Sequence, residues 1–265
     1  MSHRANVTAV VNQKGGTGKT CTAENLGVGM AMMGQKVLLI DLDPQGSLTI
    51  SMGHPRADEL NPTISTMMEK IMNEQPIGDK EGILTHPEGV DLMPANIELS
   101  GLEMSLINVI SRETILKQYI DTVNKQYDQI LIDCSPSLGL ITVNTLTAAD
   151  SVIIPVQCEY FALEGLGKLL NTLQIVQSRL NPSLEIEGFL LTMYNGILKS
   201  ANQVVADVRK HFGAMVFNTM IARNVRLSEA PSHGKPVILY DAMSAGANNY
   251  LNLAKELLSK NQCEK

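Results

Sequence analysis

The sequence has few of the features that mark disulfide-rich, metal-clustered or membrane-spanning proteins. Its four cysteines, Cys21, Cys134, Cys158 and Cys263, include no C-x-x-C pair. Such scattered cysteines argue against a zinc site, an iron–sulfur site or a disulfide framework, and they suit a reducing compartment. No run of about 18 apolar residues occurs, and no secretion signal is recognisable at the N-terminus. We therefore expect a cytoplasmic protein.

Positive charge and large aromatic residues are also scarce. Lysine and arginine total 21 against 27 acidic residues, which gives a net charge of -6. This balance argues against binding polyanions over the whole surface, although a local basic patch can still hold nucleic acid. Tryptophan is absent, and phenylalanine occurs only four times. The C-terminal segment NNYLNLAKELLSKNQCEK contains neither Phe nor Trp to anchor an amphipathic helix in lipid, and we expect no membrane partner.

The sequence does contain a repeated alternation of strand and helix patterns. Runs rich in Val, Ile and Leu predict strands at 6–12, 36–42, 90–95, 128–134, 150–156, 185–193 and 214–221. Segments of helical period predict helices at 18–33, 97–107, 111–126, 138–148, 161–180, 200–212 and 243–261. This alternation predicts a doubly wound α/β fold with a mostly parallel sheet and helices on both faces. The length suits a single domain over 1–265, with the segment 53–89 as a surface excursion.

A glycine-rich segment, NQKGGTGKT, lies between the first predicted strand and the first predicted helix. Glycines at this junction let backbone N–H groups surround phosphate oxygens at a helix N-terminus. Lys19 would reach the β- and γ-phosphates, and the Thr20 hydroxyl would ligate Mg²⁺. The predicted nucleotide-binding residues of the loop are Lys14, Gly15, Gly16, Thr17, Gly18, Lys19, Thr20 and Cys21. Gln13 replaces the first glycine of the standard pattern, which indicates a variant loop.

Three aspartates come at the ends of two predicted strands. Asp41 and Asp43 lie at the C-terminal end of the strand at 36–42, and Asp133 lies at the end of the strand at 128–134. Ligands of open α/β sheets bind at the carboxyl ends of the strands, and residues two apart on an extended chain point the same way. Asp133 has the position of a carboxylate that holds Mg²⁺ through water. We expect all three side chains to face the nucleotide.

Five ordered segments resemble the ParA/Soj family of partition ATPases, within the ParA/MinD group that has a deviant Walker A loop. They are KGGTGKT, DLDPQGS, LIDCSPSLG, PVQCEYFALEGL and RNVRLSEAPSHGKPVILYD, and together they span most of the chain. The resemblance implies a slow ATPase that binds ATP or ADP with Mg²⁺ and is a monomer without ATP. With ATP it implies a sandwich homodimer, in which Lys14 of one subunit reaches the phosphates bound by the other.

The resemblance also implies roles for individual residues. Lys14, Lys19 and Asp43 would be catalytic, with Asp43 positioning the attacking water. Asp41 would lie near the metal and the first switch, and Asp133 would be the Walker B acid. The adenine pocket would be built from 192–195 and 222–225, with Asn195 and Arg223 among its contacts. Cys21 replaces a hydroxyl residue common in relatives, and a backbone N–H can make the α-phosphate contact there.

Partners follow from the same resemblance. They are a ParB/Spo0J-like centromere-binding protein, which would stimulate hydrolysis, and non-specific double-stranded DNA at the nucleoid. Candidate DNA-binding cations are Arg209, Lys210, Arg223, Arg226 and Lys235. The segment YNGIL at 194–198 has Ile197 near the place where relatives often carry an arginine. Two alternatives stay open: a MinD-like positioning ATPase that acts on a membrane or protein cargo, and a metabolic amide-forming ATPase. The cargo could be a chromosome, a plasmid or an integrated element.

Overall fold

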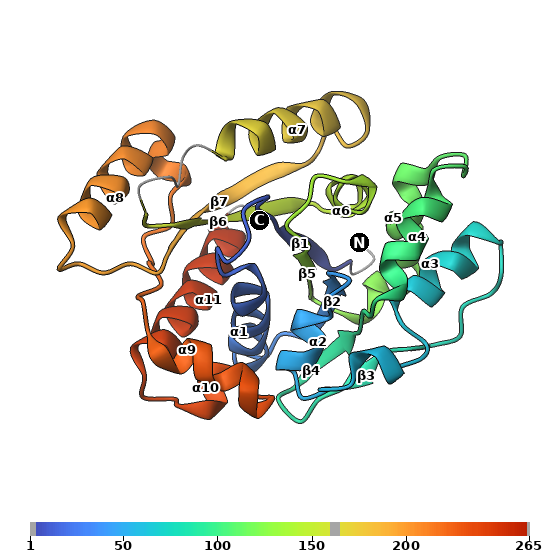
Figure 1. Ribbon diagram of the computed structural model, residues 1–265, viewed down its shortest axis with the longest axis horizontal. Coiled ribbons are helices and arrows are strands. Elements are labelled where there is room, and N and C mark those ends of the chain that lie inside the picture. Colours follow the sequence, from blue (N-terminus) through green and yellow to red (C-terminus); the bar gives the residue numbers. More distant parts are fainter. Residues whose placement is uncertain (1–3, 160–164, 264–265) are drawn as a thin grey trace.

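The runs rich in Val, Ile and Leu form a sheet that is buried on both faces. In this computed structural model, which describes residues 4–159 and 165–263, seven strands join in the order β3-β4-β2-β5-β1-β6-β7 (Figure 1). The strands are β1 (Asn6–Val10), β2 (Val37–Leu42), β3 (Leu84–Thr85), β4 (Val90–Met93), β5 (Gln129–Cys134), β6 (Ser151–Gln157) and β7 (Glu185–Thr192). All neighbours pair in parallel except β3 and β4. The predicted fold class is confirmed.

The α-helices lie in two layers, one against each face of the sheet (Figure 1). They are α1 (Lys19–Met32), α2 (Ser47–Ser51), α3 (Ile64–Met72), α4 (Glu98–Leu106), α5 (Ile115–Val123), α6 (Leu140–Ala148), α7 (Leu166–Arg179), α8 (Lys199–Phe212), α9 (Val225–Glu229), α10 (Val237–Tyr240) and α11 (Ala245–Cys263). Short 3-10 turns are η1 (Ala57–Glu59), η2 (Arg112–Thr114), η3 (Asn124–Gln126), η4 (Gly213–Met215) and η5 (Ala230–His233). The predicted helix at 111–126 is η2, α5 and η3 in succession. Residues 161–164 of another predicted helix lie outside the described residues.

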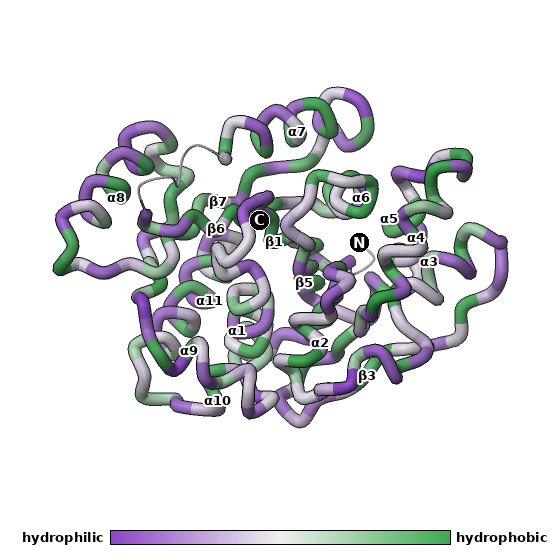
Figure 2. Tube along the Cα trace, in the orientation of Figure 1, coloured by the Kyte–Doolittle hydropathy of each residue, from purple (hydrophilic) through white to green (hydrophobic). Residues whose placement is uncertain are grey.

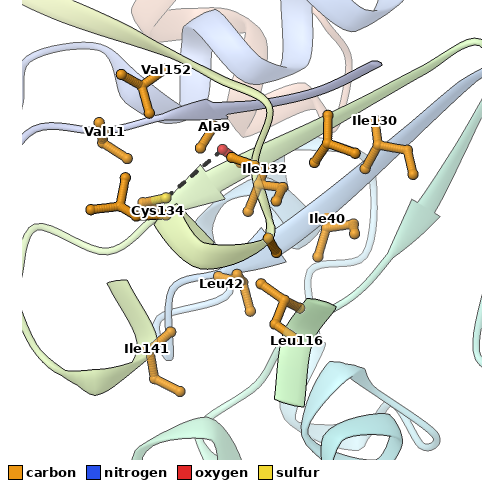
Figure 3. Packing of buried hydrophobic residues seen from close by; sticks show 14 of the residues in the cluster. Ala9, Val11, Ile40, Leu42, Leu116, Ile130, Ile132, Cys134, Ile141 and Val152 are labelled. Carbon is orange, nitrogen blue, oxygen red and sulfur yellow. Dashed lines mark hydrogen bonds between the residues drawn. The ribbon is translucent and has the colours of Figure 1, made fainter. Parts of the chain in front are cut away.

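Alternate residues of each strand belong to opposite layers, because successive side chains of a strand point to opposite faces. Leu38, Ile40 and Leu42 pack into the core under α3–α8, whereas Val37 and Leu39 pack against α1, α10 and α11. Figure 3 shows the first of these cores around Cys134, whose thiol lies 4.0 Å from the Ile132 carbonyl oxygen. Figure 2 shows hydrophobic residues along the central strands and hydrophilic residues mainly on the outer helices and loops.

The predicted strand at 214–221 is wrong as a regular strand. Its backbone meets β7 only at isolated points, where Phe217 N–H donates to Phe189 O (3.1 Å) and Ile221 N–H donates to Leu191 O (2.9 Å). Between these points the carboxylate of Glu256, from α11, accepts hydrogen bonds from the N–H groups of residues 218 and 219, at 2.7 and 2.9 Å. The ladder is interrupted because the carboxylate takes the N–H of Thr219, the donor between these two points that a regular strand would direct at β7.

The segment 53–89 is more deeply packed than a surface excursion. Ile64, Met67 and Met68 of α3 are fully buried in the core under α3–α8. Their spacing of i, i+3 and i+4 places the three side chains on one face of the helix. The segment also supplies β3, which pairs antiparallel with β4 and forms the edge of the sheet. The sequence of this segment shows one short helical pattern, but the abundant Pro, Gly and charged residues of its turns conceal how deeply that helix is buried.

A substitution at Gly27 of α1 tests how closely that helix packs on the sheet. A Cβ at Gly27 would lie 2.5 Å from Cδ2 of Leu39, which is fully buried in β2. We expect Gly27→Ala to lower the free energy of unfolding by about 1–3 kcal/mol, because overpacking forces neighbouring side chains to move. Gly101→Ala in α4, where a Cβ would meet nothing within 4 Å, is the control. It should raise stability by about 0.5–1 kcal/mol through helix propensity. Equal effects of the two variants in urea unfolding would contradict the packing argument.

Candidate functional site

The three predicted aspartates lie where adjacent parallel strands end. In the register of β2 and β5, Asp41 is directly opposite Asp133, and Val10 of β1 is opposite Asp133 on the other side. Asp41 and Asp133 therefore point to the same face of the sheet, the one covered by α1. The loop that follows β1 leads into α1 at this edge, so the fold brings the loop and both carboxylates together.

The loop between β1 and α1 has the backbone shape that its glycines permit. Gly16 and Gly18 adopt φ values of 72° and 90°, in the left-handed region that favours glycine. Gly18 directly precedes the first turn of α1, whose N–H groups have no partners within the helix. Asn12 fixes the start of the loop: its amide donates to Pro155 O (2.7 Å) and accepts from Lys14 N–H (3.0 Å). The arrangement presents backbone donors to an anion.

Two other side chains tie the loop to distant segments. The Gln13 amide donates to Gly165 O at 2.6 Å, just before α7. A glycine in place of Gln13 could not make this bond, which gives the departure from the standard loop a structural role. The Thr192 hydroxyl, at the end of β7, donates to Thr17 O at 2.8 Å. Both ends of the loop are thus held by neighbours that lie far away in the sequence.

The two lysines of the loop have different environments. Lys19 is 6% exposed, and its ammonium donates to Lys14 O at 3.3 Å. Burial lowers the pKa of Lys19, while the negative charge of Asp133 acts in the opposite direction. Lys14 is half-exposed, and within the described residues its ammonium forms no ion pair. Lys19 lines the cavity beside the loop, and Lys14 does not.

Asp41 is held by hydrogen bonds and is fully buried. Its carboxylate accepts from the Thr49 N–H (2.8 Å), the Thr49 hydroxyl (2.7 Å) and the Asp43 N–H (3.0 Å). Burial raises its pKa to about 6, and these donors limit the rise. Asp41 therefore links the end of β2 to α2. Asp43 is half-buried, accepts from Gln45 N–H at 3.0 Å and lines the cavity.

Asp133 is a buried carboxylate without hydrogen-bond donors. It is 1% exposed, and neither oxygen has a partner among the described residues. Burial and the charge of Asp41 raise its pKa well above the usual range, while the nearby Thr20 hydroxyl and the Lys19 ammonium act against the rise without completing a hydrogen bond. Buried polar atoms without partners are rare, and a hydrated cation would satisfy these two. Asp133 and Thr20 therefore fit a magnesium ion.

No group of three or more His, Cys, Asp or Glu side chains within reach of one metal ion occurs in 4–159 or 165–260. This finding is compatible with Mg²⁺, which is commonly held by one or two protein oxygens together with substrate phosphates and waters. Burial raises the pKa of Cys21 to about 12, so that its thiol stays protonated.

Two adjoining cavities follow the loop and share Gly18, Cys21 and Met193. The first, of about 520 Å³, is lined by Gly15, Gly16, Gly18, Lys19, Thr20, Cys21, Glu24, Asp43, Ser47, Ile50, Ser51, Pro136, Met193 and Pro231. The second, of about 270 Å³, is lined by Gly18, Cys21, Thr192, Met193, Ile221, Ala222, Arg223, Asn224, Leu227, Ser228 and Tyr250. The predicted adenine segments thus meet in the second cavity.

Some residues are placed differently from the prediction. Asn195 lines neither cavity, because its side-chain oxygen accepts from Ile197 N–H at 3.1 Å in the following loop. Conversely, Glu24 and Ser51 line the first cavity and were not predicted. Burial raises the pKa of Glu24 to about 8. Its spacing of i+4 from Thr20 and i+3 from Cys21 places it on the same face of α1 as these two cavity-lining residues, and this spacing is the signal that could have found it.

The candidate DNA-binding cations lie on three separate parts of the chain. Arg209 and Lys210, in the last turn of α8, are exposed and have no acidic partner within 4–159 or 165–260. Arg226 pairs with Glu229 and Asp241, at 2.7 and 3.1 Å. Arg223 pairs with Glu159 at 2.9 Å and also lines the second cavity, while Lys235 is exposed after η5. Only the α8 pair therefore offers adjacent, uncompensated charges.

The apolar face of the last helix is already covered. Leu253, Ala254 and Leu257 of α11 are fully buried in the core that α11 shares with α1. Among the described residues, no helix combines the length and apolar character needed to cross a bilayer. The leucine spacing of the C-terminal segment is thus explained by docking onto the body of the protein.

Comparisons with known proteins place the chain among ATPases of this fold. A family model described as an AAA domain matches residues 5–186. Sporulation initiation inhibitor protein Soj of Bacillus subtilis is 51% identical over 255 residues, covering 95% of this chain and 97% of that protein. Chromosome partitioning protein ParA of Caulobacter vibrioides is 47% identical over 256 residues, covering 96% and 94%.

A solved structure supports the same fold. Cobyrinic acid a,c-diamide synthase from Mycobacterium smegmatis, with bound ADP and magnesium, superposes with a TM-score of 0.85 at 35% sequence identity. The match covers 98% of this chain and 97% of that one. That protein thus binds ADP with magnesium in this fold.

Substitution of Asp133 tests whether its buried negative charge destabilises the nucleotide-free protein. An acid whose pKa is higher in the folded than in the unfolded state stabilises the fold at low pH, and this contribution is lost as pH rises through the folded pKa. We therefore expect Asp133→Asn to stabilise the nucleotide-free protein by about 1–2 kcal/mol at about pH 8, and by much less at about pH 4. Glu185→Gln, at an exposed position of β7, should show no such trend. If thermal unfolding shows the same stability difference between Asp133→Asn and the wild-type protein at both pH values, this account is contradicted.

Proposed function

Because the chain belongs to the ParA/Soj family of chromosome-partitioning ATPases, we propose that it acts as a nucleotide-switched dimer in which ATP joins two copies face to face. The chain is a monomer with ADP or without nucleotide, and hydrolysis by the protein alone is slow. The observation that carries this proposal is the contrast between the two loop lysines. Lys19 faces the cavity of its own chain, whereas Lys14 is half-exposed and lies outside that cavity.

Lys14 acts on the phosphates bound by the second copy. Its backbone is fixed by Asn12, but its side chain is free of ion pairs in the described part of the chain. A cation supplied by a partner stabilises the charge of the transferring phosphoryl group, and it makes hydrolysis depend on dimerisation. Lys14 thereby couples assembly to the chemical step, while Lys19 holds the nucleotide within one chain.

The three aspartates have different roles in binding and hydrolysis. Asp43, half-buried at the cavity wall, orients the attacking water. Thr20 and Asp133 hold the magnesium ion, which when bound offsets the charge of the β- and γ-phosphates. Asp41 acts through Thr49 by holding α2, whose Ser47, Ile50 and Ser51 line the cavity. Movement of α2 is then the step that reports the state of the nucleotide.

The adenine ring occupies the second cavity, between the end of β7 and the segment 221–228. Met193 adopts φ 53° there, an uncommon conformation for a residue other than glycine, and lines both cavities. Backbone groups around Ala222 and Asn224 are the nearest polar candidates for the purine edge. Asn195 contributes by shaping the following loop.

The ATP-bound dimer binds double-stranded DNA without sequence preference and thereby associates with the nucleoid. The adjacent, exposed Arg209 and Lys210 are the strongest candidate contacts, because Arg223 and Arg226 are already paired with acids. Dimerisation doubles the number of cations that face the DNA, which is how a protein of net charge -6 can bind phosphates only in its ATP state. A ParB-like, centromere-bound partner stimulates hydrolysis and releases the dimer.

Two other functions have weaker support. A MinD-like membrane cycle needs an accessible amphipathic helix, but the apolar face of α11 is packed against α1. An amide-forming activity like that in the name of the M. smegmatis structure would need a second set of polar substrate contacts. Most residues that line the two cavities belong instead to the loop and α1, to α2 and to the segments 192–193 and 221–228. The partition function also agrees with the higher identity of the Soj and ParA relatives.

Removal of Lys14 tests the dimer. In an Asp43→Ala background with ATP, hydrolysis is blocked and we expect a dimer by size exclusion with light scattering. Adding Lys14→Ala should return the protein to the monomer. In the Asp43 wild-type background, Lys14→Ala should lower ATP turnover by about 10²–10³-fold, because one transition-state cation is removed. The matched control is Lys36→Ala. Lys36 is exposed and directly precedes β2, at the amino end of the strands and away from the loop. A monomeric Asp43→Ala protein at saturating ATP would rule out the sandwich mechanism.

Removal of the α8 cations tests DNA binding. In the trapped Asp43→Ala dimer, we expect the Arg209→Ala/Lys210→Ala pair to weaken binding to a non-specific duplex. The slope of log affinity against log salt should become less steep by about one for each phosphate that the protein no longer neutralises. Arg56→Ala, which removes an exposed arginine paired with Glu59, should leave both quantities unchanged. Fluorescence anisotropy over a salt series measures them, and an unaltered slope in the α8 variant would place the interface elsewhere.

A further inference from the structure

Two histidines from separate segments face each other outside the nucleotide site. His54 comes just after α2, and its backbone N–H donates to Thr49 O at 3.2 Å. His86 lies in the turn between β3 and β4. Their Nε2 atoms are 3.2 Å apart, and the two rings are nearly perpendicular, at 89°. Neither the family motifs nor the proposed ATPase function uses this pair.

The separation of the two nitrogens suits a shared cation. Two imidazole ligands of a tetrahedral zinc ion, each at about 2.0–2.1 Å, have nitrogens about 3.3 Å apart. Burial lowers the pKa of both rings, which favours the neutral imidazole that can bind a metal. The same separation also fits a hydrogen bond between two neutral rings, so a second feature is needed to choose between the two.

Glu88 supplies that feature. Its Oε2 atom lies 3.8 Å from Nδ1 of His86, the ring nitrogen that faces away from His54. This oxygen is buried and has no hydrogen-bond partner among the described residues. The side chains of His86 and Glu88 are only 9% and 13% exposed. A carboxylate behind a histidine commonly fixes the tautomer that leaves the other nitrogen free to bind a metal.

We propose that His54 and His86 form a binding site for one divalent transition-metal ion of the zinc class, with Glu88 orienting His86. No third His, Cys, Asp or Glu completes the site within the described residues, so water fills the other coordination positions. Imidazole ligands favour zinc-class ions over Mg²⁺, which makes this site chemically distinct from the nucleotide site. The metal joins the end of α2 to the β3–β4 turn.

The experiment measures Zn²⁺ binding to the full chain without nucleotide, so that its outcome is independent of the proposed ATPase cycle. Isothermal titration in the presence of excess Mg²⁺ should give one Zn²⁺ per chain. His54→Ala and His86→Ala should each weaken binding at least about tenfold, and Glu88→Gln should weaken it by about 10–100-fold. His211→Ala and His233→Ala, at exposed positions on α8 and η5, should leave binding unchanged.

A second measurement guards against variants that fail to fold. Zn²⁺ should raise the Tm of the wild-type protein by roughly 5 °C at a hundredfold excess over Kd, and this rise should vanish in His54→Ala. His54→Cys restores a zinc ligand and should restore part of the rise. If the wild-type protein shows neither binding nor a shift in Tm, or if both persist in His54→Ala and His86→Ala, the pair is only a hydrogen bond between neutral rings and the proposal is overturned.

Discussion

The pairing of β2 with β5 is the constraint on which the site depends. It aligns Asp41 with Asp133 across neighbouring parallel strands and buries both carboxylates beside the loop that leads into α1. Burial raises the pKa of both carboxyl groups, and the charge of Asp41 adds to the rise at Asp133. The fold satisfies Asp41 with donors from α2 and leaves Asp133 without any. Asp41 is therefore satisfied within the fold, whereas both oxygens of Asp133 remain free of partners among the described residues.

Asp41 also connects the candidate site to α2 and to the strands beside it. Thr49 bonds to Asp41, and its hydroxyl also accepts from Ala95 N–H at 3.1 Å, so α2 is joined to the ends of both β2 and β4. On its other side, α2 leads to His54 and its contact with His86. Direct hydrogen bonds therefore connect the carboxylate of Asp41 to α2, and a cation at the histidines would bind just after the same helix.

Several elements of the fold could be predicted because local pattern and tertiary environment agree. Strands buried on both faces are continuous apolar runs, and β2 and β5 are found within one residue of the predicted limits. The strand predicted at 214–221 failed because Glu256, nearly 40 positions later in the sequence, takes two of its backbone donors. The burial of α3 was not predicted because the turns on either side of it, within 53–89, have the composition of a surface loop.

The sequence by itself determined the chemistry that is available: the glycines of the loop, its two lysines, and acids at strand ends, in an order shared with ParA/Soj relatives. These features depend on neighbouring residues and on the regular geometry of strands and helix N-termini. Only the tertiary structure decided that Lys19 is buried while Lys14 is not, that Asn195 turns away from the cavities and that Glu24 enters one. It also brought His54 to His86. Burial and contacts between distant segments arise when helices pack on the sheet, and no local pattern encodes them.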